Sequence, residues 1–171
     1  MTDVPKLLVV MGVSGSGKTT LARQLADQLD FAFMEADEFH SDEARQKMAR
    51  AEPLDDEMRE PWLNSMCQHL TRHQQSTVLA YSGLRRRHRQ RFRELGYDTG
   101  FIWLHGQFDD IRRRLDNRQG HYMPASLLTS QFRDLEMPKG ETDILMLDIH
   151  CNPKQLLTRA TAAVSLLYRS A

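Results

Sequence analysis

The sequence has few of the features that mark secreted, metal-stapled or membrane-spanning proteins. Among its 171 residues only Cys67 and Cys151 are cysteines, with no CxxC spacing and no clustered histidines, so neither a disulfide framework nor a zinc site is expected. No apolar run approaches the roughly 18 residues of a membrane span. The segment after Met1 leads directly into a short apolar run without a small-residue cleavage site, which argues against a secretory signal. We therefore expect a cytoplasmic protein with two free thiols.

Net charge is also absent. Lysine and arginine together number 23, as do aspartate and glutamate, which gives a formal net charge of zero. The long-range attraction typical of a general nucleic-acid-binding protein is therefore missing. The zero nevertheless hides segregation, because residues 35–60 are mainly acidic, residues 85–93 hold six arginines and no carboxylate, and four more arginines fall within 112–118. Charge is thus arranged locally along the chain.

Short apolar runs alternate with longer amphipathic segments. The runs predict strands over 6–11, 31–36, 77–82, 100–104 and 144–149. The amphipathic segments predict helices over 19–29, 42–51, 56–73, 85–95, 109–118, 126–136 and 153–168. Parallel strands need crossover connections, and helices supply them. We therefore predict an α/β fold in which one domain, residues 1–171, holds a mostly parallel five-stranded sheet covered by helices on both faces.

A phosphate-binding motif stands between the first predicted strand and the first predicted helix. It fits G-x-x-x-x-G-K-[ST] at every constrained position and consists of Gly12, Val13, Ser14, Gly15, Ser16, Gly17, Lys18 and Thr19. Glycines let the backbone turn its N–H groups toward phosphate oxygens, and the helix amino terminus adds partial positive charge. We expect Lys18 to reach the β- and γ-phosphates of ATP and Thr19 to ligate Mg²⁺.

The third predicted strand narrows the class of nucleotide enzyme. It ends with Ala80, Tyr81 and Ser82, without the aspartate that many P-loop ATPases place at that strand tip to hold Mg²⁺. This disfavours a motor or a GTPase switch. It favours phosphoryl transfer to a small hydroxylated substrate.

Asp37 follows the second predicted strand, and we expect it at the carboxyl edge of the sheet beside the phosphate loop. A carboxylate there can accept the proton of an acceptor hydroxyl or orient metal-bound water. The alternative is an N-cap of the next helix. His40 is a candidate partner for a sugar hydroxyl or else an exposed loop residue, and Glu35 is interpreted as the residue that closes the strand.

The two arginine-rich segments have different interpretations. The cluster of six is typical of a nucleic-acid-binding patch, but its helical spacing favours a solvated, ion-paired surface; Arg85, nearest the strand end, is its best functional candidate. Arg114 and Arg118 are four residues apart, so both can face one phosphate cluster, unless they belong to an ordinary charged helix. Gly120 is then the joint of a short lid over ATP, spanning about residues 115–125.

Beyond these motifs, nearly the whole chain resembles the P-loop gluconokinase family. Besides the phosphate loop, the matching residues are Ala36, Asp37 and His40; Lys47 and Met48; Pro53, Leu54, Asp56, Arg59, Pro61, Trp62 and Leu63; Ser82 and Leu84; Arg114, Leu115, Arg118, Gly120, His121 and Met123; and Leu127, Leu128, Ser130, Gln131, Phe132, Leu135, Glu136 and Pro138. The segment Gly-His-aromatic-Met followed by Ser-Gln-Phe is far more specific than the phosphate loop alone. The resemblance implies a nucleoside-monophosphate-kinase-like or shikimate-kinase-like fold with strand order 2-3-1-4-5, the cofactors ATP and Mg²⁺, and a homodimer.

The resemblance also implies roles for individual residues. Transfer of the ATP γ-phosphate to the 6-hydroxyl of D-gluconate would use Lys18, Asp37 and Arg118 as catalytic residues. The nucleotide would contact Gly12, Ser14, Gly15, Ser16, Gly17, Lys18, Thr19, Thr20, Arg114 and Arg118, with Thr19 on Mg²⁺. The acceptor would contact Asp37, His40, Arg59, Ser82, Arg85, His121 and Gln131. Arg59 is the leading partner for the acceptor carboxylate, a task suited to a bidentate guanidinium.

Several positions depart from the family pattern. The family usually has Asp at the position of Glu35, Gly at that of Ala51 and an acidic residue at that of Met58. Where it usually has Cys-Ser-Ala-Leu-Lys, this chain has Tyr-Ser-Gly-Leu-Arg at 81–85. Where it usually has Tyr-Arg-Asp, this chain has His-Arg-Gln at 88–90, so that Gln90 replaces the aspartate. Tyr81 and Gly83 are expected beside the acceptor pocket. Because Tyr81 is larger and Gly83 smaller than the usual residue, we expect pocket volume to be lost at one position and gained at the other. Arg85 keeps the charge of lysine but changes its reach and hydrogen-bond geometry.

The leading hypothesis is an ATP-dependent gluconokinase that uses in-line transfer, with catalysis supplied mainly by positioning and electrostatics. The nearest alternative is a P-loop kinase for another small hydroxy acid, such as shikimate or a related sugar acid. A different class, an ATP-dependent nucleic-acid-binding module, rests on the arginine cluster. The hypothesis expects a small-molecule substrate and neither a nucleic-acid nor a membrane partner.

Overall fold

The computed structural model describes residues 3–118 and 123–168. Its five-stranded sheet has the order β2-β3-β1-β4-β5, and every neighbouring pair is parallel. The strands are β1 (Lys6–Met11), β2 (Ala32–Glu35), β3 (Thr77–Ala80), β4 (Asp98–His105) and β5 (Ile144–Asp148). The predicted α/β class and strand order are confirmed.

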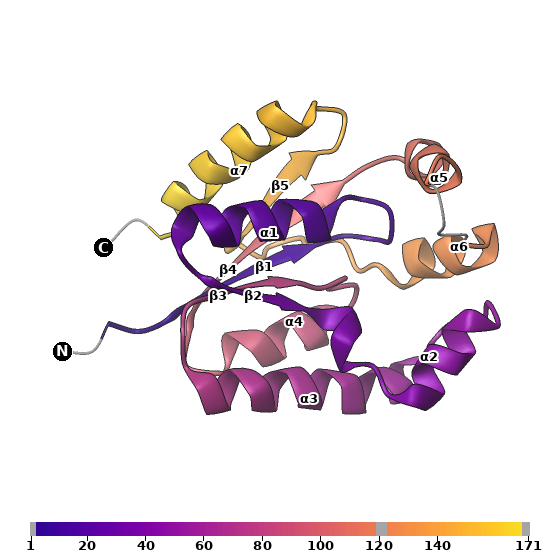
Figure 1. The fold of residues 1–171 in the computed structure, drawn as a ribbon, viewed down its shortest axis with the longest axis horizontal. Helices are drawn as coiled ribbons and strands as arrows, with labels where there is room; N and C mark the ends of the chain where they lie inside the picture. The colour runs from indigo at the N-terminus through magenta and orange to yellow at the C-terminus, as the bar shows by residue number, and fades with distance from the viewer. Residues whose placement is uncertain (1–2, 119–122, 169–171) are drawn as a thin grey trace.

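Helices cover both faces of the sheet (Figure 1). One face carries α1 (Lys18–Leu29) and α7 (Pro153–Leu167), and the other carries α3 (Asp56–His73) and α4 (Arg86–Arg93). The remaining helices are α2 (Asp42–Ala49), α5 (Phe108–Asp116) and α6 (Ala125–Asp134). These three lie at the carboxyl end of the sheet, opposite the two termini. They therefore frame the edge where the sequence places the phosphate loop and Asp37.

The sheet separates two hydrophobic cores. Leu8 and Val10 of β1 belong to the core beneath α1 and α7, whereas Leu7 and Val9 belong to the core beneath α3 and α4. Alternate strand residues point to opposite faces, so a strand covered on both faces must be apolar throughout. This requirement explains the continuous apolar run of β1, all of which is buried after Lys6.

The predicted element ends need correction at several places. The strand predicted over 31–36 stops at Glu35, and residues Ala36–Phe39 form a 3-10 turn. The helix predicted through residue 51 ends at Ala49, because Ala51 adopts a left-handed backbone with φ of 60°. Glycine tolerates this conformation without a Cβ penalty, which gives a physical reason for the glycine usual at this position in the resembling family. Residues 81–82 lie beyond β3, and β4 extends past its predicted range at both ends.

Both cysteines are free. Cys67 is buried in the core beneath α3, and the sulfur of Cys151 accepts a hydrogen bond from Arg159. None of the helices within the described residues is both long and apolar enough to span a bilayer.

Candidate active site

The phosphate loop has the geometry of an anion cradle. Gly15 and Gly17 have φ of 82° and 92°, in the left-handed region that favours glycine. A Cβ at Gly15 would also meet the Leu115 side chain at 2.7 Å. Helix α1 starts at Lys18 without a side-chain cap, and the amides of Gly15 and Gly17 donate to none of the described groups. These donors and the helix amino terminus fit the phosphates of a nucleotide.

A hydroxyl and a carboxylate meet beside this cradle. The Thr19 hydroxyl donates to Oε2 of Glu35 at 2.6 Å. Oxygen donors of this kind suit Mg²⁺, which prefers carboxylate, hydroxyl and water ligands. Glu35 ends β2, as the sequence predicted, and its carboxylate also accepts the Thr19 hydrogen bond, a contact that was not predicted. Its signal in the sequence was an acidic side chain at the carboxyl edge of the sheet, next to Asp37.

Lys18 lies where it contributes positive charge to the loop. Burial lowers the pKa of its ammonium, while the nearby carboxylates of Asp37 and Glu35 oppose that change. Arg118 acts on this pKa in the same direction as burial. Of the predicted catalytic set, Lys18 and Asp37 line one pocket, and Arg118 is not in its lining.

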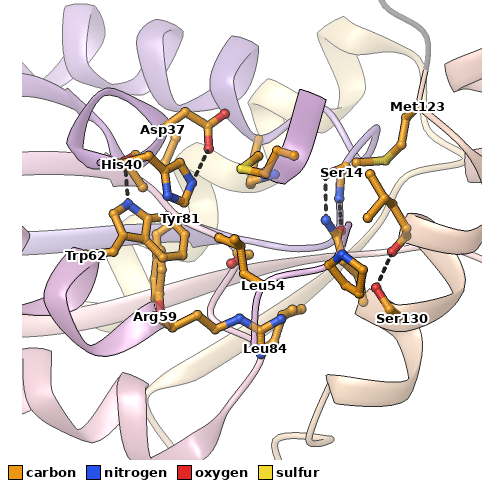
Figure 2. A pocket seen from close by; sticks show the side chains of 18 of the residues that line it. Ser14, Asp37, His40, Leu54, Arg59, Trp62, Tyr81, Leu84, Met123 and Ser130 are labelled. Carbon is orange, nitrogen blue, oxygen red and sulfur yellow. Dashed lines mark hydrogen bonds and ion pairs between the residues drawn. The ribbon is translucent and has the colours of Figure 1, made fainter. Parts of the chain in front are cut away.

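Asp37 and His40 form a pair at the acceptor side of the site. Nε2 of His40 lies 3.7 Å from Oδ1 of Asp37, and the imidazole stacks on Trp62 with ring centroids 4.0 Å apart (Figure 2). The nearby His40 imidazole, with added attraction to Lys18, holds the pKa of Asp37 below its usual value. Ser41 caps the following helix. The N-cap alternative for Asp37 is therefore wrong, and its carboxylate is ionised and open to the pocket.

One pocket joins these groups to the predicted acceptor residues. Figure 2 shows Ser14, Asp37, His40, Arg59 and Ser130 around it. Its lining also includes Lys18, Met48, Glu52, Pro53, Leu54, Trp62, Tyr81, Ser82, Leu84, Met123, Leu127 and Gln131. His40 is 8% exposed, so the alternative of an exposed loop residue is wrong. The phosphate loop and the acceptor residues thus share a single concave site.

Arg59 on the pocket wall is bonded within a group of four charged side chains, of which the other three, the predicted acceptor residue Arg85 included, are not in the pocket lining. We call Asp56, Arg59, Arg85 and Asp134 the acceptor cluster. Arg59 donates to Asp56 at 3.2 Å and to Asp134 at 2.9 Å. Arg85 donates to the same two carboxylates at 3.3 and 3.4 Å. Burial acts to raise the pKa of Asp56, but the surrounding guanidinium groups outweigh it and leave that pKa below its usual value. The cluster therefore joins two guanidinium groups to two carboxylates through four hydrogen bonds.

Gln131 connects this side of the pocket to the phosphate loop. Its Oε1 accepts a hydrogen bond from the Ser14 amide at 2.8 Å, and its Nε2 donates to the Ser14 hydroxyl at 3.0 Å. Ser82 is attached to the loop by its carbonyl oxygen, which accepts from the Gly12 amide. Both residues line the pocket, so each combines a predicted acceptor position with a direct bond to the loop.

Of two departures from the family pattern expected beside this pocket, Tyr81 lines it and Gly83 is not in its lining. The Tyr81 ring is almost fully buried and makes edge contacts with Trp62 at 5.1 Å and Phe92 at 5.3 Å. Burial raises the pKa of its hydroxyl. Gly83 has φ of 62°, and a Cβ there would meet Met11 at 3.0 Å. The larger residue thus fills space between aromatic rings while the smaller one makes the tight turn that follows.

The arginines of 85–93 all have acidic partners, although those partners are distant in sequence. They pair with Asp56, Glu60, Asp134, Glu136, Glu141 and Asp143. Arg89 has no exposed surface and makes a bidentate pair with Glu141 at 2.6 and 3.0 Å. A wholly solvated surface was therefore wrong for Arg89. The cluster is compensated by carboxylates and does not form the unpaired basic patch on which the nucleic-acid hypothesis depended.

The residues predicted to contact the nucleotide beyond Thr19 lie in different surroundings. Thr20 is exposed on the first turn of α1, and Arg118 is exposed just after α5. The guanidinium of Arg114 donates to the Ile149 carbonyl oxygen, which directs it toward the segment between β5 and α7. Gly120 and His121 lie outside the described residues, so the predicted lid joint and the predicted acceptor contact stay predictions.

Comparisons with known proteins give the family. An AAA domain family model matches residues 7–137. The thermoresistant gluconokinase of Escherichia coli (strain K12) is 40% identical over 147 residues, covering 84% of each chain. A gluconokinase structure from Sinorhizobium meliloti 1021 superposes with a TM-score of 0.89 at 34% identity, covering 96% of this chain and 94% of that one. A sugar kinase structure from Janibacter sp. HTCC2649 gives 0.87 at 39% identity, with 97% and 99% covered. The phosphate loop, the acceptor pocket and these relatives agree, and the chain belongs to the gluconokinase family.

Proposed function

We propose that this protein transfers the γ-phosphoryl group of ATP to the 6-hydroxyl of D-gluconate. The observation that carries the proposal is the single pocket in which Lys18 of the phosphate loop faces Asp37 and Arg59. A phosphate cradle, an ionised carboxylate and a buried guanidinium suit a donor phosphate, an acceptor hydroxyl and an acceptor carboxylate, respectively. Membership of the gluconokinase family supports the same acceptor.

On the donor side, the chain's own groups hold and orient the triphosphate. The loop amides and Lys18 stabilise the negative charge that spreads over the phosphoryl oxygens during transfer. Thr19 and Glu35 would hold Mg²⁺, which when bound neutralises phosphate charge. Arg118 is proposed to add a second positive charge, and the segment that follows it to form the lid that excludes water.

On the acceptor side, the groups fix the reacting hydroxyl and the opposite end of the molecule. Asp37 orients the 6-hydroxyl and can accept its proton, and His40 holds the carboxylate of Asp37 in place. Arg59 binds the substrate carboxylate, and Ser82 and Gln131 are placed to contact the intervening hydroxyls. Bringing both substrates into line supplies most of the rate enhancement because phosphoryl transfer needs little covalent help from the protein.

An acceptor panel tests this function directly. Purified protein with Mg·ATP is incubated with gluconate, shikimate, and other sugar acids, and ADP release is followed together with phosphorus NMR of the product. We expect ADP release that depends on gluconate and a phosphomonoester at its 6-oxygen. Turnover of shikimate or another hydroxy acid in preference to gluconate would make the substrate assignment wrong and leave a small-molecule kinase.

We also propose a cytoplasmic homodimer. The two free cysteines suit a reducing compartment, and the dimer is the family's expected state. Light scattering coupled to size-exclusion chromatography tests it, with a mass of twice 19.8 kDa as the expected result.

A further inference from the structure

We infer that Asp134 is a positioning residue that orients both acceptor arginines and thereby sets the preference for an anionic acceptor. The inference rests on the proposed function, since it concerns how the same pocket recognises the acceptor carboxylate. Neither the phosphate-loop motif nor the family resemblance pointed to this residue. Asp134 is the last residue of α6, at the end of the helix that also carries Gln131.

The hydrogen bonds of Asp134 are divided between two guanidinium groups, and the exposed Arg133 lies 3.7 Å from its Oδ1. Its Oδ2 accepts from Arg59 at 2.9 Å and its Oδ1 accepts from Arg85 at 3.4 Å. The Asp134 side chain is only 13% exposed and that of Arg59 only 9%, so the stronger of the two pairs is largely shielded from water. A shielded, charge-assisted contact restricts a long side chain far more than an exposed pair does.

Arg59, the arginine that lines the pocket, keeps donors free for a ligand. A guanidinium carries five N–H groups in a rigid planar fork. Among the described residues, Arg59 uses one group for Asp56 and one for Asp134, which leaves three. The planar shape means that fixing two donors fixes the direction of the rest. Asp134 therefore holds the Arg59 fork at the pocket wall without consuming its capacity to bind another carboxylate.

Helix α6 relates this arrangement to the donor phosphate. Gln131 and Asp134 are three residues apart, so they lie on the same face of the helix. Gln131 is bonded to Ser14 of the phosphate loop through two hydrogen bonds, while Asp134 is bonded to the acceptor cluster. One rigid turn of helix thus sets the distance between the two ends of the site. An acceptor of the right length is then held with its hydroxyl facing the phosphate.

If Asp134 competes with the acceptor instead of positioning the arginines, its removal should change gluconate binding in the opposite direction. Asp134 is itself a carboxylate, and if it only competed with the acceptor for Arg59 and Arg85, its removal would strengthen gluconate binding. If it positions the arginines, its removal weakens gluconate binding and leaves an uncharged polyol almost unaffected. The direction of the change in KM for gluconate therefore separates positioning from competition.

The experiment compares Asp134→Asn with the wild-type enzyme, using gluconate and the uncharged polyol glucitol as acceptors. Asparagine keeps the shape of the side chain and removes its charge. We expect the KM for gluconate to rise about 10-fold, with the KM for ATP changed less than about twofold. The ratio of kcat/KM for gluconate to that for glucitol should fall by a similar factor. Asp134→Glu, which restores the charge, should recover most of the preference.

A matched control removes a comparable ion pair away from the pocket. Asp143→Asn breaks the contact of Asp143 with Arg93 at 2.7 Å and should leave the KM for gluconate unchanged. Thermal unfolding of each variant separates a loss of folded protein from a loss of acceptor recognition. An unchanged or lower KM for gluconate in Asp134→Asn would overturn the inference. An equal rise in the KM for gluconate and the KM for glucitol would overturn it as well. A wild-type protein that neither binds gluconate by calorimetry nor phosphorylates it would instead overturn the proposed function, and this inference with it.

Discussion

The donor side and the acceptor side of the site are built in opposite ways. The phosphate loop comes from eight consecutive residues, 12–19, whose glycines and helix start supply backbone donors. The acceptor cluster takes its side chains from α3, the segment before α4, and α6, so that Arg59 meets Asp134, 75 positions further along the chain. A local motif can be recognised along the sequence. A cluster of distant side chains exists only once the chain has folded.

The two sides also differ in how they handle charge. The loop concentrates positive charge and backbone dipoles, with Lys18 at its centre, for a ligand that brings its own negative charge. The acceptor cluster is already balanced, since its two arginines face two aspartates. A balanced array gives little long-range attraction, but it holds donors in fixed directions. The donor side should therefore control turnover, and the acceptor side should control recognition.

The largest expected effect is on the donor side. Lys18→Ala removes the positive charge from the transferring phosphoryl group, and we expect kcat to fall on the order of 1,000-fold while gluconate still binds. A coupled ADP assay measures turnover, and calorimetry measures gluconate binding. Lys139→Ala, at an exposed lysine outside the pocket lining, is the control. A variant that keeps more than a tenth of wild-type kcat would remove Lys18 from its catalytic role.

The second effect concerns the buried ion pair between Arg89 and Glu141. Glu141→Gln leaves the buried Arg89 without its bidentate partner, and the free energy of unfolding at pH 7 should fall by about 3 kcal/mol. Denaturant titration followed by circular dichroism measures it. Glu52→Gln, in the exposed pair with Arg50, should cost less than about 1 kcal/mol.

The same pair predicts a pH dependence. Burial acts to raise the pKa of Glu141, but Arg89 and Arg93 outweigh it and hold that pKa below its ordinary value of 4.5. A folded-state pKa below the unfolded value means that the stabilisation is complete above about pH 4.5 and is lost as the pH falls through the folded pKa. Wild type should lose this contribution on acidification, and Glu141→Gln should not. Parallel stability curves for the two proteins down to pH 3 would contradict the assignment.

A third effect separates recognition from turnover. Arg59→Ala removes the main partner of the acceptor carboxylate, so we expect the KM for gluconate to rise about 100-fold with a smaller change in kcat. Steady-state kinetics over a wide gluconate range measure both constants. The control is Arg72→Ala, because that side chain lies on the same helix, is exposed and is outside the pocket lining. A selective fall in kcat would place Arg59 at the reacting phosphate instead.

The smallest effect tests where the metal is held. Glu35→Gln removes the charge beside the Thr19 hydroxyl, and the Mg²⁺ concentration for half-maximal activity should rise about 10-fold at saturating gluconate. Titration of Mg²⁺ at fixed ATP measures it, with the exposed Glu43→Gln as the control. If the metal requirement is unchanged, Glu35 only orients Thr19.

Sequence reasoning succeeded where the structure depends on neighbouring residues. The strands, their order and the phosphate loop were predicted, because alternation of apolar runs, glycine spacing and family motifs are all legible along the chain. The end of α2 was missed, because alanine is not a residue that signals the left-handed backbone that Ala51 adopts. The contact of Glu35 with Thr19 was missed, because it depends on α1 packing against the end of β2.

The arginines show the same division most clearly. Their helical spacing correctly indicated ion pairing, but nothing local to 85–93 says that Arg89 is fully buried or that its partner is Glu141, 52 positions away. The sequence by itself determined the zero net charge, the parallel α/β architecture and the cradle for a phosphate. Only the tertiary structure decided which charges cancel each other and which remain directed into the pocket, because ion pairs depend on distances of a few ångströms that the folded chain alone sets.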